Sequence, residues 1–244
     1  MPGKSQSGGE GMKRVNTAIL RAPGTNCDQE TAFAFQQAGA ETALIHVNEL
    51  ISRRRRLADY QILVIPGGFT YGDDISAGKV LANELKLKLG DDIMRFIADG
   101  GLILGICNGF QVLAKAGILP GLPNRDASLL TLAGNDSGRF ECRWVHLRTN
   151  KESPCVFTRG IDRLYLPVAH GEGKVVTDLK ILPHANIAVY YTDADGNIAT
   201  PTSRGYPDNP NGSVGSIAGI CDASGRVFAL MPHPERHIRG TQHP

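Results

Sequence analysis

A single cysteine between two glycines is the residue of this chain best suited to chemistry. Residues 102–113 begin as an apolar run typical of a buried strand and continue with the spacing of a helix. A strand, a sharp turn and a helix around G-x-C-x-G form a nucleophile elbow, the thiol counterpart of G-x-S-x-G. The turn would lift Cys107 out of the sheet, and the first N–H groups of the helix would favour its thiolate. We therefore predict that Cys107 is a nucleophile. The alternative is a buried structural cysteine before an ordinary strand-to-helix turn.

A histidine and a glutamate near the C-terminus supply the base that a thiol nucleophile needs. The apolar run 227–231 leads into Pro232-His233-Pro234-Glu235. Since each proline disfavours helical backbone at the residue before it, we expect His233 to be extended and to face the same way as Glu235. A carboxylate that orients an imidazole is the arrangement of a catalytic triad. Two alternatives stay open: a surface histidine beside a surface glutamate, and a metal site, which neither an HExxH nor a CxxC spacing supports.

Two glycine-containing loops fit the same centre. The loop Pro66-Gly67-Gly68-Phe69 follows the apolar run 61–65, and a Gly-Gly corner at the end of a strand can aim a backbone N–H into a crevice. Acyl transfer needs such donors where negative charge develops on the carbonyl oxygen, and we assign this oxyanion role to the N–H groups of Gly68 and Asn108. A plain turn is the alternative. The second loop, 168–173, is polar and also follows an apolar stretch.

Together these motifs resemble those of class I glutamine amidotransferases. Among them, the glutaminase subunits of phosphoribosylformylglycinamidine synthase, an enzyme of de novo purine synthesis, are the most similar. The elbow and the His-Pro-Glu segment indicate the class, and Pro-Gly-Thr-Asn-Cys-Asp with His-Gly-Glu-Gly indicate the purine enzyme. The resemblance extends from about Thr17 to Glu235 and is carried by residues 23–28, 66–69, 71–73, 105–111, 168–173, 211–213, 217–220 and 232–236.

The resemblance implies a role for each matched residue. Cys107 would attack the side-chain amide of glutamine and form a glutamyl thioester, His233 would pass protons, and Glu235 would orient His233. Gln111 and the backbone of 169–171 would hold the amino-acid end of the substrate; these substrate-binding residues are Gln111, Ala169, His170 and Gly171. Ammonia would pass to a synthetase subunit, with a small accessory subunit in the same enzyme. ATP and Mg²⁺ would belong to the synthetase, so no cofactor and no metal is expected in this chain.

Composition agrees with a globular enzyme. The chain has 244 residues, 41% hydrophobic and 20% charged, which suffices for one sizeable core. A net charge of +2 gives no electrostatic case for nucleic acid or membrane, and no apolar run approaches the ~18 residues that span a bilayer. Five irregularly spaced cysteines and a polar N-terminal segment without a signal peptide favour reduced thiols in the cytoplasm.

The order of elements predicts an α/β fold with a doubly wound, mostly parallel sheet, helices on both faces and a small antiparallel extension, as in flavodoxin-like folds. Strands are expected at 15–22, 42–47, 62–65 and 102–106, with helices at 28–38, 49–57 and within 77–98. Short strands are expected at 138–147, 164–168, 187–191, 213–221 and 226–231. Ligands of such folds bind at the carboxyl ends of strands, where both the Gly-Gly corner and the elbow lie. Residues 1–13 are predicted to be a flexible tail before a single domain, 14–244.

Several features have more than one interpretation. Cys27 follows the first strand and could face the crevice, although a structural role is favoured. The run 53–56 of four arginines is typical of a solvated helix end, with a docking face for the synthetase as the sharper hypothesis. Arg139 matches the family pattern, and we expect it to lie near the site or at a subunit contact. Residues 201–212 are expected to form a loop. The chain ends at Pro244, whereas the family usually continues into a further helix.

Two other classes of function remain in view. A different Cys-elbow hydrolase on a similar sheet, such as a γ-glutamyl hydrolase or a deglycase, is disfavoured by the His-Pro-Glu segment and the purine-type loops. A non-catalytic binding or regulatory subunit is disfavoured because Cys107, His233 and Glu235 are all present.

Overall fold

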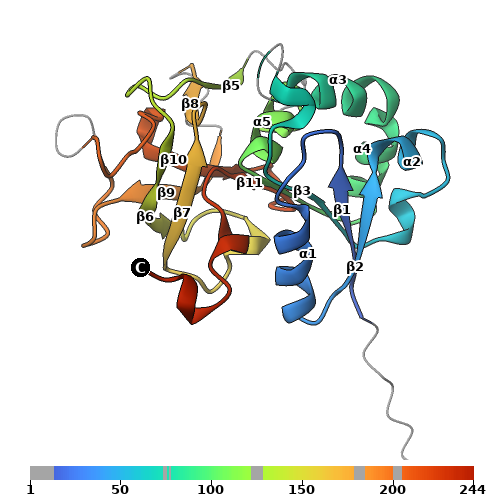
Figure 1. Ribbon diagram of the computed structural model, residues 1–244, viewed down its shortest axis with the longest axis horizontal. Coiled ribbons are helices and arrows are strands. Elements are labelled where there is room, and N and C mark those ends of the chain that lie inside the picture. Colours follow the sequence, from blue (N-terminus) through green and yellow to red (C-terminus); the bar gives the residue numbers. More distant parts are fainter. Residues whose placement is uncertain (1–13, 74–75, 77, 122–128, 179–184, 200–204) are drawn as a thin grey trace, which may run out of the picture.

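One nine-stranded sheet forms the centre of the molecule (Figure 1). The computed structural model describes residues 14–73, 76, 78–121, 129–178, 185–199 and 205–244. The tail predicted for residues 1–13 lies outside this part, as do residues 201–204 of the predicted loop 201–212. The strand order is β2-β1-β3-β4-β11-β10-β9-β6-β7.

The first half of the sheet is parallel. The alternation of strands and helices predicted this for the strands up to residue 106, whereas residues 226–231 were expected among the later short strands and also pair in parallel. Strand β1 pairs with β2 and β3, and β4 pairs with β3 and β11, all in parallel register. These strands are β1 (Asn16–Arg21), β2 (Glu41–His46), β3 (Ile62–Ile65), β4 (Leu102–Ile106) and β11 (Val227–Leu230). Their apolar residues form the middle of the core, with Ile19, Val64, Ile103 and Ala229 at most 1% exposed.

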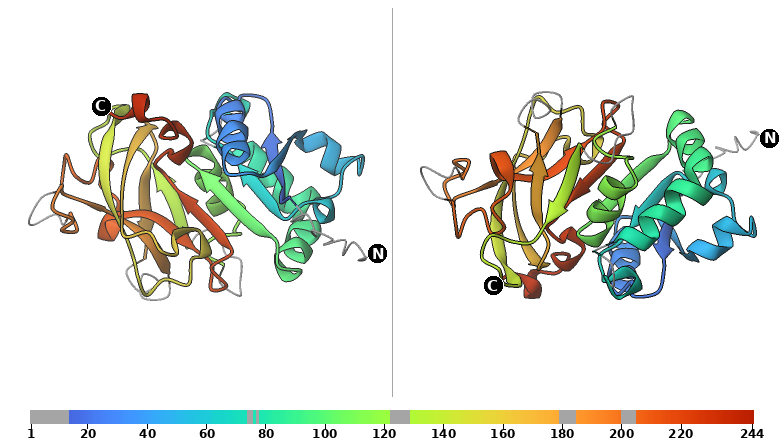
Figure 2. Two further views of the ribbon diagram at one scale, coloured as in Figure 1. Left: turned by 90° about the horizontal axis from the view of Figure 1, so that it is seen from below. Right: turned by 90° about the horizontal axis from the view of Figure 1, so that it is seen from above.

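Helices cover both faces of the parallel strands. Helix α1 lies on one face, and α3 and α4 lie on the other (Figure 2). Right-handed crossovers produce this division, because the chain moves one way across the sheet from β1 to β2 and the other way from β2 to β4. The helices are α1 (Asp28–Gln37), α2 (Val47–Ile51), α3 (Lys79–Lys88), α4 (Gly90–Ala98) and α5 (Asn108–Lys115).

The second half of the sheet is antiparallel. Strand β10 connects the halves, since it pairs antiparallel with β11 and with β9. Strand β6 then pairs with β9 and β7. These strands are β6 (Glu141–Thr149), β7 (Arg163–His170), β9 (Asn186–Thr192) and β10 (Ile217–Cys221). A separate pair, β5 (Leu130–Ala133) and β8 (Lys174–Thr177), was not predicted.

The helix predicted for residues 49–57 is wrong in extent. Helix α2 ends at Ile51, and a short 3₁₀ helix follows at Leu57–Asp59. Arg53 adopts a left-handed conformation with φ of 58°, which ends the helix, and residues 53–56 are exposed. The arginine run therefore lies in the connection after α2 and not within a helix.

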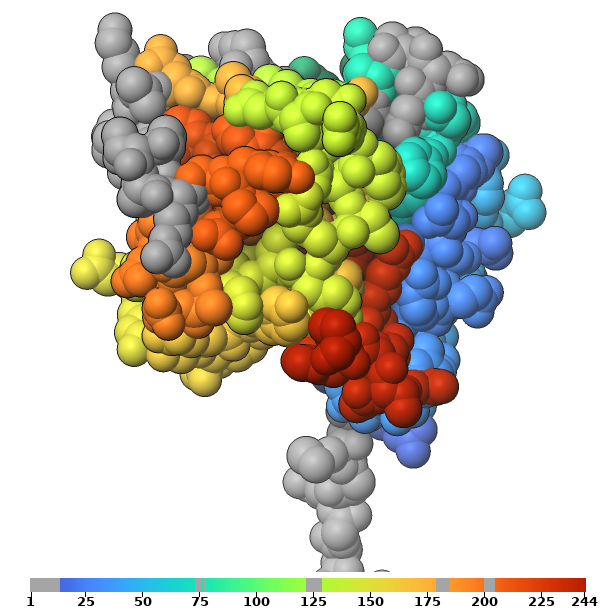
Figure 3. Space-filling view, turned by 60° about the vertical axis from the view of Figure 1, so that its left-hand side comes forward, coloured from blue at the N-terminus to red at the C-terminus, as the bar shows by residue number. Residues whose placement is uncertain are grey.

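The last residues of the chain return to the first helix. A 3₁₀ helix, Pro234–Arg236, follows β11 and lies close to α1 and β7. On the surface, these C-terminal residues lie between the N-terminal part of the chain and the antiparallel part (Figure 3). No helix in the described ranges is long and apolar enough to cross a membrane.

Candidate active site

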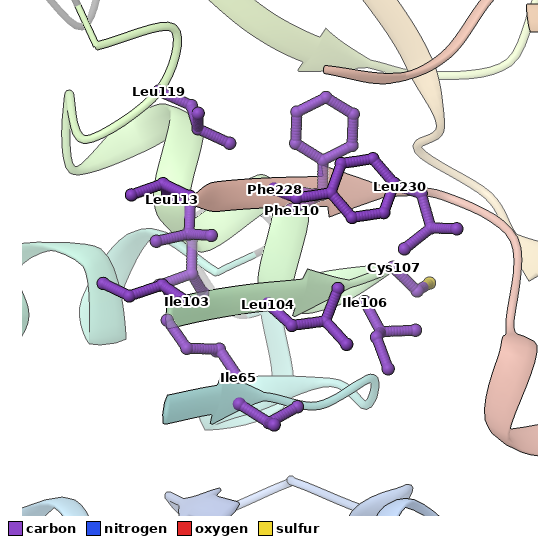
Figure 4. Packing of buried hydrophobic residues seen from close by; sticks show 14 of the residues in the cluster. Ile65, Ile103, Leu104, Ile106, Cys107, Phe110, Leu113, Leu119, Phe228 and Leu230 are labelled. Atoms are coloured by element: carbon purple, nitrogen blue, oxygen red, sulfur yellow. The ribbon is translucent and has the colours of Figure 1, made fainter. Parts of the chain in front are cut away.

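The predicted elbow is present, and its two glycines are required by close packing. Cys107 lies between β4 and α5 with φ of 51° and ψ of −104°, a strained conformation for a residue with a side chain. A Cβ on Gly109 would lie 1.9 Å from the carbonyl oxygen of Ile65, and one on Gly105 would lie 2.7 Å from Leu113. The helix can therefore start directly against the strands. Figure 4 shows the sulfur of Cys107 at the end of β4, beyond the packed apolar side chains.

His233 and Glu235 form a buried pair. The Nδ1 atom of His233 lies 2.6 Å from Oε1 of Glu235, and both residues are 2% exposed. The closeness was predicted, but the expected extended backbone is wrong. His233 has φ of −107° and ψ of 88°, and Glu235 lies in the 3₁₀ helix that Pro234 begins. Because a carboxylate only accepts, Nδ1 carries the hydrogen, and Nε2 remains as the second reactive nitrogen.

The nucleophile and the base meet in one cavity of about 310 Å³. Most residues predicted for the site line it: Gly68, Cys107, Gln111, Ala169, His170, Gly171 and His233. Asn108 and Glu235 do not line it, but they contact Gln111 and His233, which do. The cavity sits at the carboxyl ends of the parallel strands, as the fold predicted. The thiol of Cys107 points toward the carbonyl oxygen of Ala169 at 3.7 Å.

A larger hollow of about 510 Å³ lies at the opposite ends of β3 and β4. Arg53, Arg55, Arg56 and Arg95 contribute to its lining. No cysteine or histidine of the described chain lines it. The chemistry is therefore assigned to the smaller cavity.

Charge and burial compete at His233. Burial alone would lower the pKa of the imidazole, because a charged ring loses its hydration. The interactions with Cys107, Cys27 and the carboxylate of Glu235 outweigh burial and raise the pKa well above its usual range. The ring therefore retains its proton at neutral pH and is equipped to act as a general acid.

A chain of hydrogen bonds connects the loops after β3 and β7 through the first turn of α5. The hydroxyl of Thr70 donates to Oδ1 of Asn108 at 2.7 Å, and Nδ2 of Asn108 donates to Gln111 at 2.8 Å. The Nε2 atom of Gln111 then donates to the carbonyl oxygen of Glu172 at 2.6 Å. Both ends of the Gln111 amide thus contact protein, so this side chain holds the loop after β7 in addition to lining the cavity. Thr70 and Glu172 were not predicted as site residues.

His170 in the wall of the cavity is a neutral ring. Asn135 donates from Nδ2 to the carbonyl oxygens of His170 and Arg139, both at 2.8 Å, so its Oδ1 is the acceptor that faces Nδ1 of His170 at 3.1 Å. The His170 ring must therefore donate from Nδ1, and its buried Nε2, which has no partner among the described residues, carries a lone pair. Burial, with a smaller effect from His233, lowers the pKa of His170 to about 4. Asn135 was not predicted, because nothing near it in sequence marks its role.

Gly68 and Asn108, the predicted oxyanion donors, lie at a glycine corner and at the start of a helix. Gly68 has φ of 151°, and a Cβ there would lie 2.7 Å from the carbonyl oxygen of Gly24. Only glycine fits this corner, which brings the backbone to the edge of the cavity. Asn108 begins α5, so its N–H lies in the first turn, where no intrahelical acceptor exists. Elsewhere in the lining of the cavity, the carbonyl oxygen of Gly171 accepts from the N–H of Asn135 at 2.9 Å, so this carbonyl already has a partner within the protein.

Cys27 and Arg236 also reach the cavity. A sulfur, a ring nitrogen and a carboxylate oxygen from Cys27, His233 and Glu235 lie within 4.8 Å of one another, a donor set that suits zinc. However, Nη2 of Arg236 lies 3.0 Å from the sulfur of Cys27. A guanidinium in that place opposes a second cation, which disfavours the metal alternative.

Comparisons with known proteins show what this chain is similar to. A family model described as a CobB/CobQ-like glutamine amidotransferase domain matches residues 14–244. Phosphoribosylformylglycinamidine synthase subunit PurQ of Dehalococcoides mccartyi is 60% identical over 233 residues, which cover 96% of this chain and 89% of that protein. PurQ of Methanococcus maripaludis is 47% identical, over 93% of this chain and 84% of that protein. A chain in the structure of PurLQS from Thermotoga maritima aligns with a TM-score of 0.73 and 31% identity, covering 94% of this chain and 92% of that one.

Proposed function

This chain belongs to the family of CobB/CobQ-like glutamine amidotransferase domains, and we propose that Cys107, His233 and Glu235 are the triad with which it releases ammonia from glutamine. It is the glutamine amidotransferase subunit of a phosphoribosylformylglycinamidine synthase and serves purine biosynthesis. One observation carries the proposal. The strained Cys107, near the middle of the chain, and His233, near its C-terminus, line a single cavity, and the buried Glu235 contacts His233.

The first half of the reaction forms a thioester. The thiolate of Cys107 attacks the carbon of the glutamine side-chain amide, and the N–H groups of Gly68 and Asn108 donate to the oxygen that becomes negative. His233 gives its proton to the amide nitrogen, the C–N bond breaks, and ammonia leaves. The raised pKa of His233 suits this step, since the ring holds a proton to give.

The second half returns the enzyme to its starting state. The now neutral His233 removes a proton from water, and the resulting hydroxide attacks the thioester carbon. The C–S bond breaks, glutamate leaves, and a thiolate remains on Cys107 beside a protonated His233. Glu235 keeps the ring orientation through both halves by accepting from Nδ1.

The cavity also offers groups for the amino-acid end of glutamine. His170 and the side chain of Gln111 line the cavity, and residues 169–171 form the neighbouring wall. A neutral His170 fits this role, because a charged ring would repel the α-ammonium group of the substrate.

The partner subunits complete the enzyme. Ammonia passes to the synthetase subunit, PurL, and a small accessory subunit belongs to the same assembly, in line with the PurLQS structure. We assign ATP and Mg²⁺ to the synthetase, since the steps above need only groups of this chain. We also place the protein in the cytoplasm, because all five cysteines, each within the described residues, are free thiols.

The test is the choice of nitrogen donor in the reconstituted assembly. Amidine formation is measured with glutamine or with ammonium at the same low concentration. We expect glutamine to be far the better donor and to release glutamate in step with amidine. If glutamine serves no better than ammonium, this chain is not the ammonia-supplying subunit.

A further inference from the structure

A second cysteine lies in the catalytic cavity and is fixed there by its backbone. Cys27 is 1% exposed and lines the cavity with Cys107 and His233. Its N–H donates to the carbonyl oxygen of Gly67 at 3.2 Å, and its own carbonyl oxygen accepts from the N–H and the hydroxyl of Thr31 at 3.1 and 2.5 Å. The start of α1 and the loop after β3 therefore set where this side chain lies.

The sulfur of Cys27 has polar partners on two sides. Its S–H donates to Oδ1 of Asn26 at 3.2 Å, and its lone pairs accept from Nη2 of Arg236 at 3.0 Å. Arg236 in turn lies 3.8 Å from Glu30 of α1. A cysteine that only fills space in a core has no need of a guanidinium donor. The contacts instead fix the position of the sulfur relative to the segment that carries the base.

The same sulfur packs beside the catalytic imidazole. It lies within 4.8 Å of a ring nitrogen of His233 and of a carboxylate oxygen of Glu235. A Cβ on Gly67 would lie 2.8 Å from Cε1 of His233 and 3.1 Å from the sulfur of Cys27. Gly67, Cys27 and Glu235 thus bound the ring together.

We infer that Cys27 is a positioning residue of the glutaminase reaction, which holds the imidazole of His233 in place through a sulfur anchored by Arg236. The inference rests on the proposed function and adds a residue that acts through His233 without touching the substrate.

The inference predicts an effect on proton transfer as well as on rate. The titratable groups that face His233 are Cys27, Cys107, Glu235 and His170. Cys27 is among those that raise the pKa of His233, so its removal lowers that pKa. His233 then loses its proton at lower pH, and the alkaline limb of the kcat profile moves to lower pH.

The experiment measures kcat, KM and their pH profiles in the reconstituted assembly for Cys27→Ala and Cys27→Ser. We expect Cys27→Ala to lower the glutamine-dependent kcat roughly 10- to 100-fold, with little change in KM and with the alkaline limb moved to lower pH. Serine can donate to Asn26 and accept from Arg236, so Cys27→Ser should recover most of the lost kcat. Ammonium-dependent synthesis should not change in either variant.

Two controls make the outcome decisive. Cys155→Ala removes a similarly buried sulfur outside this cavity and should leave kcat and its pH profile unchanged. Arg236→Gln, which keeps Cys27 but removes its donor, should repeat the direction of Cys27→Ala and serves if that variant fails to fold. A wild-type kcat and pH profile in Cys27→Ala would overturn the inference, as would equal losses in the alanine and serine variants with an unmoved alkaline limb. If the wild-type assembly itself makes no use of glutamine, the proposed function fails instead.

Discussion

The imidazole of His233 is buried, yet its surroundings favour the charged form. A ring that is 2% exposed would ordinarily lose its proton, but two sulfurs and a carboxylate lie against it. Among these groups, Glu235 also decides which nitrogen carries the hydrogen. The first prediction therefore concerns this carboxylate.

Replacement of Glu235 by glutamine should remove most of the activity with little change in shape. The amide lacks the charge that orients Nδ1–H and stabilises the protonated ring, so we expect kcat for glutamine hydrolysis to fall roughly 10³- to 10⁴-fold. Steady-state glutamate release in the assembly measures this. Glu30→Gln, also a glutamate near Arg236, is the matched control and should retain activity. Equal activity in Glu235→Gln and wild type would remove Glu235 from the triad.

A side chain at position 67 should displace the catalytic ring. Gly67→Ala places a Cβ 2.8 Å from Cε1 of His233, so the ring must move, and a displacement of this size costs about 10²-fold in rate. Gly240→Ala, where a Cβ meets nothing within 4 Å, is the control. An unchanged kcat in Gly67→Ala would mean that the position of His233 is not held from this side.

Protonation of His170 should destabilise the fold in acid. Its folded-state pKa of about 4 lies below the value near 6.5 of an unfolded histidine, so the unfolded chain binds more protons between these values. Stability is therefore complete above about pH 6.5 and falls as pH decreases toward 4, by up to about 3 kcal/mol. Urea unfolding of His170→Asn should lack this slope, whereas the exposed His243→Asn should keep it. Parallel pH curves for His170→Asn and wild type would show that folding does not lower the pKa of this ring.

Sequence was informative where special residues constrain the backbone. Cys107 was predicted because glycines flank it. Glu235 was matched to His233 because Pro232 and Pro234 disfavour helical backbone at the residues before them. Thr70, Asn135 and Arg236 were missed as site residues, since their partners are distant in sequence. Arg236, for example, contacts Cys27 across 209 positions. A local pattern carries no trace of such a pair.

The elbow is the element on which the site depends. Helix α5 starts so close to β3 that a Cβ on Gly109 would lie 1.9 Å from the carbonyl oxygen of Ile65. Gly109→Ala must separate the helix from the strand, and we expect a loss of about 2–4 kcal/mol in the free energy of unfolding, together with lower activity. Chemical denaturation measures the first and glutamate release the second. Wild-type stability would contradict the requirement for glycine here.

Among the elements, buried strands were predicted best. Strands β3 and β4 are short apolar runs, and such runs leave few alternatives to a buried strand. The helix expected at 49–57 failed because its polar arginines carry no helical periodicity and Arg53 turns left-handed. Strands β5 and β8 are short, only partly buried and paired across a long separation, so their own residues did not reveal them.

Across the whole molecule, the two halves of the sheet have different tasks. The parallel half carries Cys107, while β7 of the antiparallel half supplies Ala169 and His170, and the segment after β11 brings His233 back between them. The alternation of strands and helices predicted the parallel half except for β11, which was expected among the later short strands. The antiparallel half is built from pairings between strands that are distant in sequence. No local pattern specifies these pairings, so its extent could not be predicted.

The most direct test of the central claim is Cys107→Ala in the reconstituted assembly, with amidine formation measured from glutamine and from ammonium. We predict that the variant loses synthesis from glutamine by roughly 10⁴-fold or more while it keeps wild-type synthesis from ammonium. Retention of glutamine-dependent synthesis would contradict the assignment of Cys107 as the nucleophile.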